Sequence, residues 1–146
     1  MRPALRYGAS IGALCFLAAC AGGPPTASAT VGDLVLTRGF AYEPIIQASG
    51  AAYVEITNRG TAPDTLLGAS SPAAAGAMLH GGSMAHVMTL PIPAGGTLSL
   101  APGGTHIMLS DFSAMPQAGD SLALTLTFAR AGSVTLQLPV RKYGDE

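Results

Sequence analysis

Residues 121–140 read SLALTLTFARAGSVTLQLPV, and this stretch decides the fold class. From Ser121 to Phe128 an apolar side chain falls on every second residue, with threonine or alanine between. Such alternation places all the large apolar groups on one face of an extended chain. Arg130-Ala131-Gly132 is a turn signal, and Ser133–Val140 after it alternates again. The stretch therefore predicts two β-strands separated by a turn.

The same composition recurs towards the N-terminus, where short segments rich in Val, Leu, Ile and Thr are separated by Gly, Pro, Asn and Asp. These segments predict further strands at Asp33–Phe40, Ala51–Asn58, Asp64–Ala69, Val87–Ile92, Thr97–Leu100 and Thr105–Leu109. No segment has a convincing 3.6-residue period, and the alanine-rich stretch Ser71–Ala77 is too short to indicate a helix. The sequence predicts an all-β domain, a Greek-key sandwich or barrel.

The N-terminus has the features of an export signal. Arg2 and Arg6 precede a short apolar segment, residues 11–19, which is well below the ~20 apolar residues that span a bilayer. Residues 1–19 are therefore predicted to be a signal peptide. Leu17-Ala18-Ala19-Cys20 resembles the lipobox of bacterial lipoproteins, which implies cleavage before Cys20 and lipidation of that cysteine. Cleavage after Ala29, giving a soluble periplasmic protein, is the alternative.

Residues 20–30 are rich in Gly, Pro, Ala, Ser and Thr and are predicted to be a flexible tether, followed by one domain at 31–146. Removal of the signal removes Cys15, and lipidation of Cys20 would leave no free thiol, which suits the oxidising periplasm. Beyond residue 19 the chain has five basic and eight acidic residues, so no nucleic-acid partner is expected. The predicted membrane contact is the lipid anchor alone.

The residues with metal chemistry are concentrated in one window. Residues 78–108 hold all three histidines and four of the six methionines. Imidazole and thioether suit monovalent copper, whereas thioether is too soft a ligand for zinc or magnesium. Methionine sulfur also cannot form disulfides in an oxidising compartment. The cluster predicts a Cu(I) site.

Within this window His106 and Met108 are two residues apart on a predicted strand, so both project to the same face. Met84 precedes His106 by 22 positions, and the segments Val87–Ile92 and Thr97–Leu100 are expected to form a hairpin that returns to the same end. Met84 follows Gly81-Gly82-Ser83, which is typical of a loop, where an exposed thioether has no packing role.

A histidine from the neighbourhood of Met84 is expected to complete the site. His80 lies just before the glycine pair, and His86 shares a face with Met84 if the chain is extended there, so either residue is a candidate. Met78 and Met88 lie in apolar strand patterns and are predicted to be core residues. Met115, beside a proline in a loop, is expected to be packed or exposed and to have no role.

The chain resembles the periplasmic copper chaperones of the PCuAC type, whose signature is His, a loop, Met, 21 residues and His-x-Met. Ala85–Thr105, between Met84 and His106, is 21 residues long. The resemblance covers about Val31 to Val140. It extends through Ala51-Ala-Tyr-Val-Glu-Ile-Thr-Asn58, Asp64-Thr-Leu-Leu-Gly-Ala-Ser-Ser-Pro72, Ile92-Pro-Ala-Gly-Gly96 and Pro102-Gly-Gly-Thr-His-Ile-Met-Leu109.

The resemblance implies a cupredoxin-like β-sandwich that binds one Cu(I) and delivers it to a recipient protein. The recipient would be a cytochrome c oxidase subunit or another assembly chaperone for its copper centres. By position, the implied ligands are His80, Met84, His106 and Met108. Two features depart from the family: the loop from His80 to Met84 is shorter than usual, and Met78 stands where an acidic residue is frequent.

Other functions are less well supported by the sequence. No nucleophile motif or phosphate-binding loop is present, so the protein is not expected to be an enzyme. The alternatives are copper storage or tolerance, and a structural β-sandwich lipoprotein that binds no metal. If histidine ligates Cu(I), protonation competes with the metal, and affinity should fall as the pH falls through the imidazole range near ~6.5.

Overall fold

The computed structural model describes residues 25–83 and 85–145, and these residues form strands, turns and loops. Its eleven strands are β1 (Ala27–Val31), β2 (Leu34–Tyr42), β3 (Ser49–Asn58), β4 (Asp64–Ser70), β5 (Ala74–His80), β6 (His86–Val87), β7 (Leu90–Ile92), β8 (Thr97–Leu100), β9 (His106–Phe112), β10 (Ser121–Phe128) and β11 (Gly132–Arg141). The prediction of an all-β fold is confirmed. The described part of the chain contains no helix long and apolar enough to cross a membrane.

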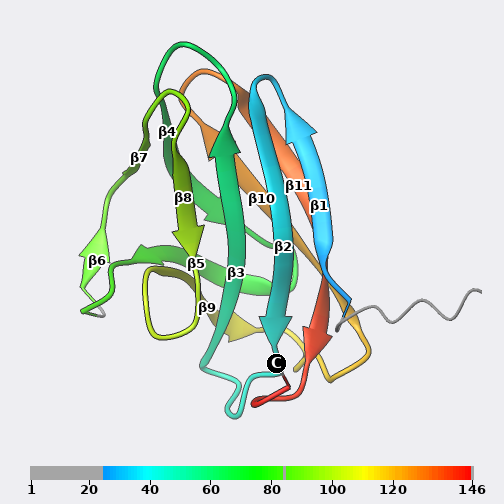
Figure 1. Cartoon of the computed structure of the whole chain (residues 1–146). Coiled ribbons are helices and arrows are strands. Elements are labelled where there is room, and N and C mark those ends of the chain that lie inside the picture. The colour runs from blue at the N-terminus through cyan, green and yellow to red at the C-terminus, as the bar shows by residue number, and fades with distance from the viewer. Residues whose placement is uncertain (1–24, 84, 146) are drawn as a thin grey trace, which may run out of the picture.

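The strands form two layers that are joined at one side. The order of hydrogen-bonded neighbours is β6-β5-β9-β3-β2-β11-β10-β4-β7, with β1 added beside β2 and β8 beside β3. In Figure 1, β1, β2 and β3 pass in front of β10 and β11. A short parallel pairing of Val140 with Ala41 and of Arg141 with Tyr42 connects the layers. Neighbours far apart in sequence, such as β9 beside β3, are typical of Greek-key sandwiches.

The core lies between the layers and follows the alternation seen in the sequence. On β10, the residues Leu122, Leu124, Leu126 and Phe128 are all buried. The opposite layer contributes residues such as Leu36 and Ile56, which have no exposed surface. Because one face of each strand is buried in this way, a shift by one residue would expose a whole set of apolar groups, and the register is fixed.

Two strands lie where none was predicted. The prediction of a tether ending at Thr30 is wrong at its C-terminal end, because Ala27–Val31 is β1 and pairs with β2. Its small side chains Ala27 and Ala29 pack against the core. The alanine-rich segment before His80 is β5, which pairs with β9 along its length. Alanine has low strand propensity, and tertiary pairing overrides that preference here.

The hairpin expected from Val87–Ile92 and Thr97–Leu100 is also wrong. The first segment is divided into β6, which pairs with β5, and β7, which pairs with β4. The second segment, β8, pairs with β3 in the other layer. Ile92 and Leu100 are both buried, so the chain crosses between layers at this turn to place each of them in the same core.

Candidate metal centre

The candidate centre is built on two neighbouring antiparallel strands, β5 and β9. Their register places His80 directly opposite His106 and Met78 directly opposite Met108. Directly opposed residues in an antiparallel pair have Cβ atoms ~4.5–5.5 Å apart and project to the same face. Two histidines and two methionines therefore form a compact square on one face of the sheet.

That face is the outer one. Leu79 and Ile107, which lie between the paired residues on their strands, are 2% and 0% exposed and point into the core. Because side chains alternate along a strand, the square of histidines and methionines points away from the core. The prediction that His106 and Met108 share a face agrees with this geometry.

The two histidines of the square lie close enough to share an ion. The ring centroids of His80 and His106 are 5.5 Å apart, in an edge-to-face arrangement. Bonds from a metal to imidazole nitrogen are about 2 Å long, so this spacing leaves room for one ion between two rings. His86, on β6, is exposed, and its ring centroid is 6.4 Å from that of His80. His80 is part of the square and faces His106, whereas His86 lies beside the square, opposite His80 on the next strand.

His106 is oriented by its own backbone turn. Its Nδ1 lies 3.0 Å from the carbonyl oxygen of Gly104. A carbonyl can only accept a hydrogen bond, so in the neutral ring Nδ1 carries the proton and Nε2 keeps its lone pair. Metal-binding histidines usually have their second nitrogen held in this way. The geometry prepares Nε2 of His106 to act as a ligand.

His80 is also prepared to bind a cation. Burial lowers its pKa from the ordinary imidazole value, and His106 and His86 lower it further by charge repulsion. Its Nδ1 is buried and has no hydrogen-bond partner in the described residues. A neutral imidazole with an unpaired buried nitrogen has a free lone pair or an unused donor, and a bound cation would satisfy the lone pair.

Met84 lies outside the described residues, so its place in the centre stays a prediction. The residues around it form a tight loop, in which the N–H of Gly81 donates to the carbonyl of Ala85 over 2.8 Å. A Cβ atom on Gly82 would lie 3.9 Å from the Cα atom of Gly104, in the turn before His106. The described part of this loop therefore lies beside the square.

The sequence-based assignment of two other methionines is wrong. Met78 and Met88, which were predicted to lie in the core, are 38% and 76% exposed. The buried residue at this point of β5 is Leu79, which points into the core, and Met78 lies on the opposite face of the strand. A period of two counted back from His80 would have placed Met78 on the histidine face. Met115 is 41% exposed, within the expectation for it.

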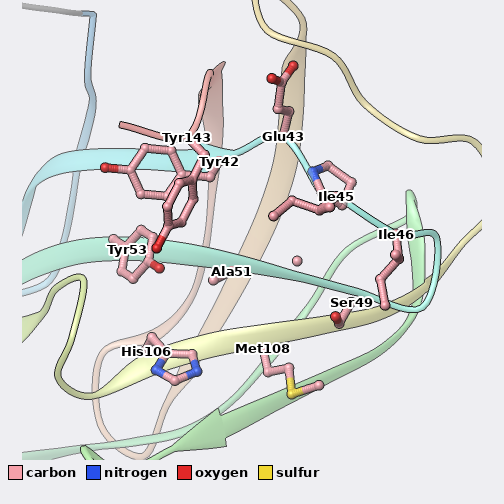
Figure 2. Close-up of a pocket in the computed structure, with 12 residues that line it drawn as sticks. Tyr42, Glu43, Ile45, Ile46, Ser49, Ala51, Tyr53, His106, Met108 and Tyr143 are labelled. Atoms are coloured by element: carbon pink, nitrogen blue, oxygen red, sulfur yellow. The ribbon is translucent and has the colours of Figure 1, made fainter. Parts of the chain in front are cut away.

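An open pocket of about 420 Å³ adjoins the square. Figure 2 shows His106 and Met108 on one wall, with Tyr53 and Ala51 on the neighbouring strand and Tyr42 beyond them. The rings of Tyr42 and Tyr53 have centroids 5.7 Å apart. Burial raises the pKa of Tyr53, and the nearby tyrosines raise it further, so this phenol stays neutral. The wall that Tyr42 and Tyr53 form is therefore aromatic and uncharged, and Glu43 also lines the pocket.

The donor set limits the metals that suit the centre. Within residues 25–83 and 85–145, no three His, Cys, Asp or Glu side chains are grouped so that they could hold a metal ion. A centre built on the square would combine thioether sulfur with imidazole nitrogen. That mixture is soft and uncharged, which favours Cu(I) over zinc, magnesium or calcium.

Fold and site together define a cupredoxin-like β-sandwich with paired histidines and methionines on its outer face. The chain belongs to the LpqE-like family, described as "Putative lipoprotein LpqE-like", which it matches over residues 35–140. It is 35% identical over 101 residues to "Putative lipoprotein Lxx21020" of Leifsonia xyli subsp. xyli (strain CTCB07). That match covers 64% of this chain and 61% of the relative, so the chain spans about three fifths of the relative's length.

Solved PCuAC structures share the fold. The copper-bound PCuAC domain from PmoF2 is 26% identical, with a TM-score of 0.74 over 80% of this chain and 98% of that domain. The solution structure of CuI-DR1885 from Deinococcus radiodurans is 30% identical, with a TM-score of 0.64 over 81% and 83% of the two chains. The resemblance to the PCuAC family is confirmed by these similarities.

Proposed function

We propose that this protein is a Cu(I)-binding carrier whose ligands are His80, Met84, His106 and Met108. The observation that carries the proposal is the register of β5 and β9, which places His80 opposite His106 on the outer face with Met108 two residues further along. Neutral nitrogen and sulfur ligands match the preferences of monovalent copper. Two of the similar structures, those of PmoF2 and DR1885, are described as copper-bound and CuI-bound.

The function we infer is delivery of copper to a recipient protein, with assembly of the copper centres of cytochrome c oxidase as the candidate process. Transfer requires that an incoming ligand reach the ion. Met108 lines the open pocket beside the square, so the centre is accessible from that side. Tyr42 and Tyr53 give this approach an uncharged wall against which an apolar part of a recipient could pack.

We further propose that the chain is exported and anchored in the membrane by lipid on Cys20. Cleavage at the alternative site after Ala29 would remove three of the five residues of β1. It would also remove Pro25, whose carbonyl accepts hydrogen bonds from the Arg141 side chain at 3.2 and 2.6 Å. Cleavage before Cys20 leaves β1 intact. The similarity to a relative named as a putative lipoprotein supports an anchored protein on the outer side of the membrane.

The test of the proposed function is an anaerobic competition between the exported chain, purified in detergent, and a chromophoric Cu(I) chelator. The natural protein should withdraw one equivalent of Cu(I). Met108→Leu should weaken binding, because it removes one sulfur and keeps a similar volume. Met115→Leu is the matched control, since this exposed methionine lies outside the square. Absence of Cu(I) binding by the natural protein would overturn the proposed function.

A further inference from the structure

Met78 has no structural role that its position in β5 explains. Its side chain is 38% exposed on the outer face, although methionine is a large apolar residue. The buried position of this part of β5 is taken by Leu79. Met88 and Met115 are exposed as well, so any explanation of a particular role for Met78 must come from its neighbours.

The neighbours of Met78 supply that explanation. Across the strand pair it is opposite Met108, and two residues along its own strand is His80. These are two of the proposed copper ligands, and both project to the same face as Met78. Methionine has three rotatable side-chain bonds and reaches positions that a branched residue cannot. Met78 therefore lies next to both ligands: it is on the same strand as His80 and opposite Met108.

We propose that Met78 is a further Cu(I) ligand, so that β5 and β9 by themselves supply two imidazoles and two thioethers. This inference rests on the proposed function: because Cu(I) takes at most four such ligands, Met78 and Met84 would alternate as the second thioether of its centre. His80 and His106 are each 9% exposed, whereas Met78 is the most accessible of the four. Met78 is therefore the ligand that an incoming partner would displace first.

In this arrangement the two histidine ligands are held in place, whereas the thioether of Met78 can change position. The two histidines are buried, and the ring of His106 is held by Gly104. Both are anchored on paired strands whose core faces, at Leu79 and Ile107, fix the register. Met78, by contrast, is 38% exposed, so its side chain could leave the ion without moving either strand.

The first test uses isotope-labelled methionine methyl groups, observed by NMR while Cu(I) is added anaerobically to the exported chain. Cu(I) is diamagnetic, so the methyl signals of ligating methionines shift without broadening from unpaired electrons. The signals of Met78 and Met108 should both shift with one equivalent. The signal of Met115, which has similar exposure but lies outside the square, should not. Signals are assigned by Met→Leu substitution.

The second test compares Cu(I) affinities by chelator competition. Met78→Leu should weaken binding by at least about tenfold, since even residues that only support metal ligands change affinity by roughly 10–100-fold. Met115→Leu should leave it unchanged. Because Met78 is exposed, its substitution should not alter the melting temperature of the metal-free protein, and this is the folding control.

The outcomes separate the two proposals. If Met108→Leu weakens binding while Met78→Leu does not, and the Met78 methyl signal stays in place, the role of Met78 is disproved and the proposed function stands. If the natural protein binds no Cu(I), both proposals fall. Shifts of both signals together with weakened binding in both variants would establish the ligand set.

Discussion

At the scale of single residues, the three histidines differ in burial although they lie close together in the sequence. His80 and His106 are buried, and their rings face each other across β5 and β9. His86 is exposed and lies one strand further out. Burial removes competing water from a ligand and fixes its ring, so the buried pair is better suited to hold an ion than the exposed residue.

The contrast between His80 and His86 predicts unequal effects of substitution. His80→Ala should weaken Cu(I) binding by at least about tenfold, because it removes a pre-positioned nitrogen. His86→Ala should change it less than about threefold, within the range of an uninvolved surface residue. The measurement is the same chelator competition at neutral pH. Equal losses in the two variants would show that His86 shares the site.

A second residue-level feature stabilises the end of the sandwich away from the histidines. The carboxylate of Asp64 accepts backbone hydrogen bonds from Thr65, Arg130 and Ala131 at 2.7, 2.9 and 2.9 Å. Burial by itself would raise the pKa of this carboxyl, but these donors together lower it below the usual value. The charged form is therefore the one that the folded protein favours.

This lowered pKa predicts a pH-dependent contribution to stability. A carboxyl with a lowered pKa in the folded state stabilises the protein above its unfolded value of ~3.9, and the contribution is lost as the pH falls through the folded value. Asp64→Asn should be less stable at pH 7 by about 1–3 kcal/mol, because an amide nitrogen would oppose a backbone N–H.

Chemical unfolding at several pH values measures this effect. The difference between Asp64→Asn and the natural protein should shrink as the pH falls below about 4, where the natural carboxyl becomes protonated. Asp120→Asn is a control, since that carboxylate accepts one exposed hydrogen bond, from the N–H of Gln117. A difference that is constant over the whole pH range would contradict the account.

At the scale of elements, β1 extends the sandwich into a segment that looks like a linker by composition. Its alternate residues Ala27, Ala29 and Val31 pack against the core. Pro25, just before the strand, accepts hydrogen bonds from Arg141 at the end of β11. The N-terminal strand thus ties the beginning of the domain to its last strand.

This predicts that the starting residue of the chain affects its stability. A chain that begins at Thr30 should melt about 5 °C or more below one that begins at Ala21, since ~1 kcal/mol corresponds to about 4 °C in a domain of this size. Differential scanning calorimetry of the two metal-free chains measures the shift. A shortened chain that ends at Tyr143 is a useful comparison, because it leaves β1 and Arg141 in place. Equal melting temperatures for the Thr30 and Ala21 chains would show that β1 is dispensable.

At the scale of the whole molecule, the domain presents the histidines and methionines on the outer face of one layer. The adjoining pocket is lined by Tyr42, Tyr53 and Tyr143 (Figure 2). A lipid on Cys20 would hold this small domain near the membrane, with only a few residues between the anchor and β1. A carrier anchored this closely is suited to recipients that lie at the same membrane.

The anchor predicts a change in distribution when the cysteine is replaced. Cys20→Ala should move the protein from the membrane fraction to the soluble fraction of exporting cells, because the thiol that carries the lipid is absent. Purified chains with and without the lipid should bind Cu(I) equally, since the square lies on β5 and β9. Immunoblots of the fractions give the measurement. An unchanged membrane fraction for Cys20→Ala would contradict lipidation at this residue.

The sequence by itself determined the fold class, because alternation is a local property. The apolar residues of 121–128 lie on every second position, and this pattern already defines a strand with one buried face. The same period gave His106 and Met108 a common face. The histidines and methionines could be chosen as candidates from their chemistry alone, before any strand was placed.

Only the tertiary structure decided which strands are neighbours. Nothing local to residues 74–80 indicates that they pair with 106–112, and β5 is rich in alanine, which does not favour strands. The hairpin expected from Val87–Ile92 and Thr97–Leu100 does not form, although the two segments are close in sequence. Their strands β7 and β8 pair in different layers, and in this arrangement Ile92 and Leu100 are both buried. Met78 and His80 share a face because they are two residues apart on one strand. Only packing of the whole sandwich decides that Leu79 fills the core and that the histidine face is the outer one, since a register is fixed only when all strands bury their apolar sides together.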